Sequence, residues 1–281
     1  MGQEEGAFAA AIDLVNLAKR LEKIWAWPSF YSRSLEAREL ADQTLAELLR
    51  QTRVPEATLR QYQRQFSICL PSDEWLVQAL GAFYLHEKKL IFGSASGEPL
   101  DTMPGGVELE RPGRLFFKPH STLQLFVDQF RRLRMEAQAP LANTGLISVD
   151  NAMSMHQRIF HPNAEGVAYC ATRMSAYRSL PARLGLTKAR GALLITLFAM
   201  RRCLAEQHVL PPSLDSLRPQ YLIDVPLDPF SAAPLNYDNR LGRIWSVGTD
   251  LKSQGGAPTS PPMSDDKEPT VEIGIGISST E

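Results

Sequence analysis

The sequence predicts an α+β fold, in which a predominantly helical N-terminal region precedes a smaller module that ends in an antiparallel sheet. Through most of residues 7–138, apolar side chains recur at intervals of three to five residues, which is the spacing of amphipathic helices. After His208, prolines alternate with short apolar runs, a pattern typical of turns and short strands. We therefore expect two regions, residues 1–182 and residues 183–281.

Prolines and serines mark the predicted helix boundaries. Pro28 ends the first periodic stretch, Ser34 is placed to cap the second, Pro55 opens the third, and Ser72 is placed to cap the fourth. The apolar run GALLITLFAM is about half as long as a membrane-spanning helix requires, so it predicts a buried helix. The predicted helices are residues 7–26, 34–53, 55–69, 72–90, 120–138 and 186–207.

Other stretches lack helical spacing. Residues 93–118 are rich in glycine and proline near their start, which predicts a long loop. Prolines and glycines interrupt residues 139–182, which are expected to be less regular. Near the C-terminus, PLNYD and RIWSV flank an Asp-Asn turn and predict a hairpin, and TVEIGIGIS predicts one further strand.

Charge and cysteine content exclude some classes of partner and site. The 30 Lys and Arg residues are balanced by 31 Asp and Glu residues, so no overall field attracts nucleic acid, and no nucleic-acid partner is expected. Cys69, Cys170 and Cys203 lie far apart, without CxxC spacing, in apolar settings typical of buried thiols. A single disulfide remains an open alternative.

Other residue patterns point to no particular reaction. His156 and His161 are five residues apart, which does not place them on one face of a straight helix. GSASG is not a nucleophile elbow between a strand and a helix, and no phosphate-binding or dinucleotide-binding fingerprint occurs. The residues alone therefore predict no catalytic site and no cofactor other than the metal ion considered below.

The last third of the chain carries strings that resemble a known family. ALLITLFAMRRCLAEQHVLPPSLDSL, YLIDVPLDPFSAAPLNY and RIWSVGTD follow one another, and DPF…PLNY and SVGTD…GG…DD are their most specific parts. Residues 190–275 thereby resemble the soluble part of the major pseudopilin of type II secretion. The resemblance implies a pseudopilin-like C-terminal module, with a long helix, a proline-marked turn and a small antiparallel sheet.

The order of regions along the whole chain also resembles bacterial membrane-anchored proteins with a helical middle and a pseudopilin-like end. That resemblance implies a periplasmic or cell-envelope location, with contact to the membrane only through an N-terminal anchor that precedes residue 1. Pseudopilins begin with a leader and a long apolar helix, whereas about 180 residues of helical sequence precede Arg190 here. We therefore do not expect assembly as an ordinary pseudopilus subunit.

The resemblance further implies a calcium site in RIWSVGTDLKSQGG, residues 243–256. In the family, the loop after S-x-G-x-D binds calcium through aspartates and backbone carbonyls, and calcium prefers about six to eight oxygen ligands. Matched position by position, the aspartate ligands in this sequence are Asp250, Asp265 and Asp266.

A plain β-turn followed by a solvated acidic tail is the alternative to the calcium site. Lys252 lies inside the loop that would surround the ion, and the insertion APTSPPM lengthens the spacing to the later aspartates. Carbonyls near Leu251 or Ser253 are the further oxygens that a calcium site would use.

The resulting functional expectation is a non-enzymatic cell-envelope protein that acts through protein–protein contacts. Its partners would be components of a secretion or pilus-like system, or other copies of itself. The rival is an envelope enzyme whose site lies between helices near the 93–118 loop. A deep polar pocket with convergent titratable groups favours the enzyme, and an exposed apolar patch favours the binding protein.

Overall fold

The computed structural model describes residues 2–24, 28–52, 54–96, 117–138, 161–253, 255–257, 262–263 and 269–273. Helices dominate these ranges, and a small antiparallel sheet follows them, so the predicted α+β class is confirmed. The helices are α1 (Gly2–Glu22), α2 (Pro28–Gln51), α3 (Glu56–Ile68), α4 (Asp73–Ser96), α5 (Pro119–Gln138), α7 (Ala164–Arg178), α8 (Leu180–Gln207) and the 3-10 helix η2 (Leu214–Leu217). The strands are β1 (Asn236–Asp238), β2 (Arg243–Trp245) and β3 (Thr270–Glu272).

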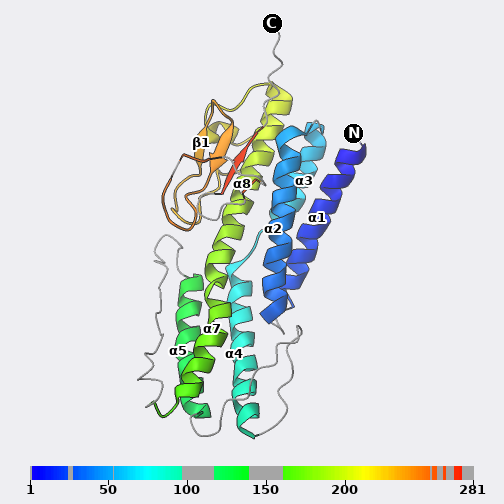
Figure 1. The fold of residues 1–281 in the computed structure, drawn as a ribbon. Coiled ribbons are helices and arrows are strands. Elements are labelled where there is room, and N and C mark those ends of the chain that lie inside the picture. The colour runs from blue at the N-terminus through cyan, green and yellow to red at the C-terminus, as the bar shows by residue number, and fades with distance from the viewer. Residues whose placement is uncertain are drawn as a thin grey trace.

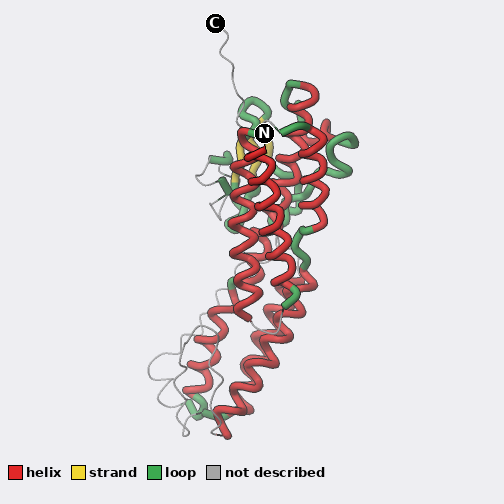
Figure 2. The backbone as a smooth tube through the Cα atoms, turned by 90° about the vertical axis from the view of Figure 1, so that its right-hand side faces the viewer, coloured by secondary structure: helices red, strands yellow, loops and turns green. Residues whose placement is uncertain are grey.

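The molecule is elongated, and α8 runs along its middle. Figure 1 shows α1, α2, α3 and the sheet around the upper part of α8, with α4, α5 and α7 forming the lower part. Figure 2 shows the same division after a quarter turn. The N-terminus and the sheet therefore lie at one end of the molecule, although they come from opposite ends of the chain.

Two hydrophobic cores correspond to these two parts. The first joins α1, α3, much of α2, the second half of α8 and the sheet, with members that include Phe8, Leu45, Phe66, Phe198 and Ile244. The second joins α4, α5, α7 and the first residues of α2 and α8, with members that include Tyr31, Phe83, Phe126, Tyr177 and Leu184. Helices α2 and α8 contribute to both cores and so connect the two parts of the molecule.

The sheet has the order β1-β2-β3, with both neighbouring pairs antiparallel. Tyr237, Ile244 and Val271 lie opposite one another across its three strands. Ile244 and Val271 are buried in the first core, against which Tyr237 also packs. The predicted hairpin and the third strand are thus present, and a long helix precedes them as expected.

Several boundaries differ from the sequence predictions. Helix α2 begins at Pro28, because proline is well tolerated in the first turn of a helix. The prediction of Ser34 as a helix cap is wrong, since Ser34 lies inside α2 and donates its hydroxyl to the carbonyl of Tyr31. Ser72 does cap α4, because its hydroxyl accepts the Glu74 N–H at 3.2 Å.

The stretch predicted to be less regular contains a helix, α7. Asn163 precedes this helix, and its side-chain oxygen accepts the Lys118 N–H at 2.7 Å and the Thr122 hydroxyl at 3.2 Å. The polar side chain thereby holds the start of α7 against the start of α5. Residues 97–116 and 139–160 lie outside the described residues, and so does most of the predicted 93–118 loop.

Pro181 interrupts no helix, because it occupies one of the first positions of α8. The boundary expected between residues 182 and 183 therefore falls just inside α8.

All three cysteines are buried free thiols, which confirms the prediction of buried cysteines and removes the disulfide alternative.

Candidate functional site

The chain after β2 folds back onto Trp245. The indole N–H donates to the Ser253 hydroxyl at 2.9 Å, and a Cβ built on Gly256 would lie 2.6 Å from the indole ring. Gly255 and Gly256 have φ values of 92° and 67°, a region of backbone conformation that is strained for residues other than glycine. The double glycine therefore allows the backbone to turn and to approach the tryptophan closely.

Asp250, the first predicted calcium ligand, takes part in a local turn. Its Oδ1 accepts the Lys252 N–H at 3.0 Å, and Leu251 between them has a φ of 58°. The other two predicted ligands, Asp265 and Asp266, lie outside the described residues. Asp250 alone supplies fewer oxygens than calcium needs, so the ion remains a prediction.

The described ranges contain no group of three or more His, Cys, Asp or Glu side chains placed to hold a metal ion. The geometry available at Asp250 is that of an Asx turn, in which a side-chain oxygen accepts a backbone N–H two residues further on.

A buried aspartate, Asp228, holds the other side of this loop. Its Oδ1 accepts the Phe230 N–H at 3.0 Å and the Ser246 hydroxyl at 2.9 Å, and its Oδ2 accepts the Val247 N–H at 2.8 Å. The side chain is fully buried, so these bonds replace its contacts with water. Asp228 comes from the DPF string and binds the SVG string, and the sequence analysis did not identify this role.

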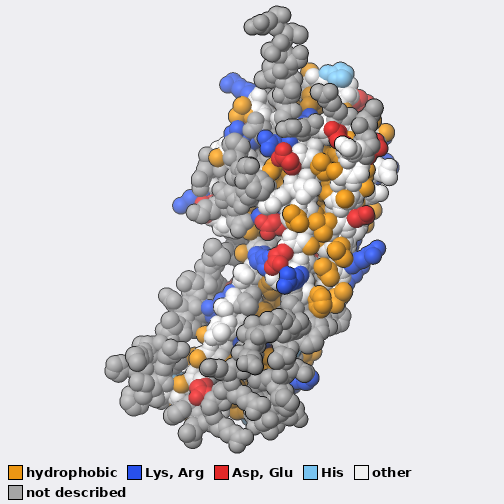
Figure 3. All heavy atoms as spheres, turned by 45° about the vertical axis from the view of Figure 1, so that its right-hand side comes forward, with side chains coloured by type: hydrophobic (Ala, Val, Ile, Leu, Met, Phe, Trp, Pro, Cys, Tyr) orange, Lys and Arg blue, Asp and Glu red, His pale blue; other side chains and the backbone are white. Residues whose placement is uncertain are grey.

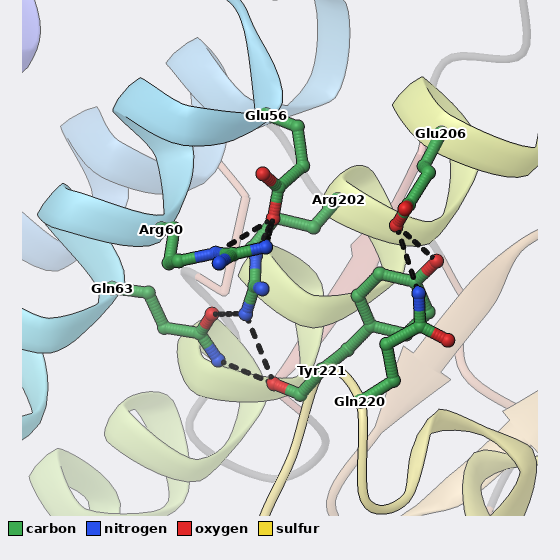
Figure 4. A network of polar contacts seen from close by, with 7 residues as sticks. All are labelled: Glu56, Arg60, Gln63, Arg202, Glu206, Gln220 and Tyr221. Carbon is green, nitrogen blue, oxygen red and sulfur yellow. Dashed lines mark hydrogen bonds and ion pairs between the residues drawn. The ribbon is translucent and has the colours of Figure 1, made fainter.

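A second polar network joins the N-terminal helices to the segment after η2. Figure 4 shows Arg202 of α8 reaching between α3 and this segment. Its Nε donates to Glu56 at 2.7 Å, and its Nη1 donates to Gln63 at 2.8 Å and to the Tyr221 carbonyl at 3.3 Å. Burial alone would raise the pKa of Glu56, but the hydrogen bonds from Arg202 and Arg60 lower it below its ordinary value.

Glu206 completes this network on the opposite side of Tyr221. Its carboxylate accepts the Tyr221 hydroxyl at 2.7 Å and the Gln220 amide at 3.0 Å. Burial and the hydrogen bond to Glu206 raise the pKa of Tyr221 to about 12. The polar atoms of this network thus bond to one another, as expected of a structural connection rather than a reactive centre.

A third charged cluster is buried between α1 and α2. Arg38 donates from Nε to Asp42 at 2.8 Å, and its Nη1 donates to the carbonyl of Cys69. Glu22 lies nearby, and burial raises its pKa from 4.5 to about 7, although the positive charge of Arg38 opposes this shift. Among the described contacts, Glu22 Oε1, Arg38 Nη2 and Asp42 Oδ2 make no hydrogen bond.

A fourth cluster lies in the second core, around Glu87 of α4. Its fully buried carboxylate accepts hydrogen bonds from Tyr169 at 3.2 Å, from Tyr177 at 2.6 Å and from the Arg173 Nε at 2.9 Å. Burial, together with the negative charge of Glu87, raises the pKa of both tyrosines above the ordinary range. Both carboxylate oxygens are therefore occupied by donors from α7.

A hollow opens between α2 and α8, and the sequence analysis did not predict it. Its volume is about 130 Å³, and it is called the α2–α8 hollow below. Two residues at its edge form an ion pair, Arg190 Nη2 with Glu39 Oε1 at 3.0 Å. The residues that line the hollow are Leu35, Glu39, Arg183, Leu186, Thr187 and Arg190.

The side of the molecule formed by α1, α2 and α3 exposes large apolar side chains. Figure 3 shows hydrophobic side chains on the face where these helices lie, among charged and other polar side chains. The exposed fraction is 58% for Leu40 and 72% for Ile68. The exposed large apolar residues of these helices and of the residues directly after them are called the apolar side below: Leu17, Ile24, Phe30, Leu40, Ile68 and Leu70.

Among the described residues, none of the helices has the length and apolar composition needed to cross a membrane. Comparison of the chain with protein-family models finds no match. Searches of curated proteins and of solved structures likewise find no match.

Proposed function

We propose that this protein is a non-enzymatic component of the bacterial cell envelope that acts through protein–protein contacts. The observation that supports this proposal most is the apolar side formed by α1, α2 and the end of α3. Single exposed apolar residues are ordinary on soluble proteins, but their gathering over neighbouring helices is typical of an interaction surface. The proposed partners are components of a secretion or pilus-like system, or other copies of this chain.

Two of the buried charged groups support a structural role rather than catalysis. The carboxylates of Glu87 and Asp228 are fully buried, and both oxygens of each already accept hydrogen bonds. The α2–α8 hollow, at about 130 Å³, is too small for a drug-sized substrate, since pockets for such ligands begin at roughly 300 Å³. An enzymatic site near the 93–118 loop remains a prediction, because residues 97–116 lie outside the described residues.

The envelope location and the link to secretion rest on the resemblance of residues 190–275 to the major pseudopilin. The proposed location includes a tether to the membrane by an anchor ahead of residue 1.

Calcium bound by Asp250, Asp265 and Asp266 belongs to the same proposal. Thermal unfolding of the parent and of Asp250→Ala, in excess calcium and in chelator, tests the ion. A rise of several degrees in the parent that the variant lacks supports it, and no calcium-dependent shift in the parent contradicts it.

Photo-crosslinking in bacterial cells tests the contact surface. A photoreactive side chain is placed at Leu40 or Ile68, and at Met135 of α5 as a control of similar exposure, since Met135 is 69% exposed. We expect discrete adducts with another envelope protein, or with a second copy, from the two positions on the apolar side. Mass spectrometry identifies the adducts.

Equal adducts from all three positions would indicate non-specific contact and would contradict the proposal. Cell fractionation with the same strains tests the location separately. Recovery of the full-length protein only in the cytoplasmic fraction would exclude the envelope setting, whatever the crosslinking shows.

A further inference from the structure

We propose that the α2–α8 hollow binds a carboxylate, from either a free short-chain acid or an acidic side chain of a bound protein. This inference goes beyond the proposed function and does not depend on the apolar side. Two leucines, a threonine, a glutamate and two arginines line the hollow, and the leucines and arginines together suit a group with a charged end and an aliphatic stem.

Arg183 is the residue that would make the primary contact. Its Nη1 donates to the Ser32 hydroxyl at 2.8 Å, and its Nη2 lies 3.8 Å from Glu36 Oε1, which is too far for a hydrogen bond. A guanidinium carries five N–H donors in a planar fork, and paired donors of this kind match the two oxygens of a carboxylate. The side chain is 31% exposed, so a ligand can reach it from solvent.

Arg190 supplies a second positive charge in a fixed position. Its Nε donates to the Met263 carbonyl at 3.2 Å, and its Nη2 pairs with Glu39 at 3.0 Å. Arg183, Thr187 and Arg190 follow one another at helical spacing, which places them on one face of α8. The side chain of Arg190 is only 4% exposed, so its charge is poorly screened by water, and the Glu39 carboxylate at 3.0 Å offsets part of that charge.

Size favours a carboxylate over a larger anion. A volume of about 130 Å³ accommodates a carboxylate with a few methylene groups, and Leu35 and Leu186 provide apolar surface for that stem. Glu36 and Glu39 lie beside the two arginines and repel any anion.

Nuclear magnetic resonance titration of the arginine side chains tests the site. The probes are sodium propionate and the neutral isostere propionamide, at constant ionic strength. We expect propionate to shift the Arg183 resonances saturably and propionamide to leave them in place. Glu39→Gln is expected to bind propionate several-fold more tightly because it removes a repelling charge, a gain that misfolding cannot produce.

Arg183→Gln provides the complementary variant, with Arg131→Gln on the exposed surface of α5 as its matched control. Loss of the charge-assisted hydrogen bonds is expected to weaken propionate binding about tenfold or more in Arg183→Gln. The affinity of Arg131→Gln for propionate is expected to equal that of the parent. Equal binding of propionamide, or equal affinities in the two arginine variants, would overturn the proposal. Weaker binding by Glu39→Gln would do the same.

A second arm distinguishes the two sources of the carboxylate. The peptide acetyl-Gly-Glu-Gly-amide is compared with its glutamine counterpart and with propionate. At least tenfold tighter binding of the glutamate peptide than of propionate assigns the site to a protein side chain. Similar or weaker binding of the peptide assigns it to a free acid, and both results keep the carboxylate site.

Discussion

The carboxylate of Asp228 accepts a hydrogen bond of 2.9 Å from the hydroxyl of Ser246 and thereby joins two distant parts of the C-terminal module. The Ser246 hydroxyl in turn accepts the Gly248 N–H at 3.1 Å, while Asp228 accepts the Val247 N–H at 2.8 Å. The path of the chain after β2 is therefore fixed by a buried carboxylate that lies before β1.

Asp228→Asn is expected to destabilise the fold, because it turns one carboxylate oxygen into a donor that must face other donors. The amide nitrogen would meet either the Val247 N–H or the Phe230 N–H and the Ser246 hydroxyl. Leaving buried donors unsatisfied costs about 3 kcal/mol of unfolding free energy. Urea denaturation measures the loss of unfolding free energy. Asp224→Asn is the control, because the Asp224 side chain is 75% exposed, and its unfolding free energy is expected to change by less than about 1 kcal/mol.

Gly256→Ala is expected to displace Trp245, whereas Gly255→Ala is not. Both glycines have positive φ, so either alanine carries a backbone cost of about 1–2 kcal/mol. Only the Cβ at position 256 would meet the indole, at 2.6 Å, because the space around position 255 is open to 4 Å. Near-ultraviolet circular dichroism should change for the first variant and stay that of the parent for the second.

Identical spectra for the two glycine variants would show that the close approach to Trp245 does not persist in solution. A difference between them would identify Gly256 as a requirement of packing against Trp245, independently of any calcium bound at Asp250.

The sequence predicted those features that depend on neighbouring residues. Helical spacing located most helices, Ser72 marked the start of α4, and the turn after Asp238 indicated the hairpin. Helix α7 was missed because prolines and glycines surround it, and because Asn163 secures its start through contacts with Lys118 and Thr122 far away in the sequence.

The candidate site was less predictable, because its parts come from separate elements. DPF and SVGTD were both singled out as strings, yet nothing local to either shows that Asp228 binds Ser246 and Val247. The α2–α8 hollow likewise depends on how two helices cross, which brings Glu39 to Arg190. Contacts of this kind are set by tertiary packing, and the spacing of residues along one helix does not encode them.

Glu22→Gln is expected to stabilise the protein above neutral pH. Burial raises the pKa of Glu22 from 4.5 to about 7, so between these pH values the folded state binds more protons than the unfolded chain. Stability therefore falls as pH rises through this window, by about 3 kcal/mol, and the loss is complete above about pH 7. Glutamine resembles the protonated acid and avoids this loss.

The difference in unfolding free energy between Glu22→Gln and the parent isolates this group, since the remaining groups are common to both proteins. We expect a difference near zero at about pH 4.5 that grows until about pH 7 and then levels off. A difference that is constant with pH would show that Glu22 is not buried in the folded protein.

Arg202→Lys is expected to loosen the connection between α3, α8 and the segment that carries Tyr221. Lysine retains the charge, but its single nitrogen cannot reach Glu56, Gln63 and the Tyr221 carbonyl together as the guanidinium does in Figure 4. Because Arg202 is buried and the groups left behind lose their donor, the cost is about 2–4 kcal/mol of unfolding free energy.

Arg60→Lys is the matched control, since Arg60 contacts the same Glu56 carboxylate but is 47% exposed. Its expected loss of unfolding free energy is less than about 1 kcal/mol. Hydrogen exchange locates the effect, with faster exchange expected at the Tyr221 and Leu222 amides, which donate to the Leu217 carbonyl. Equal losses for the two lysine variants would mean that Glu56 alone carries the connection and that Arg202 does not hold this segment to α3.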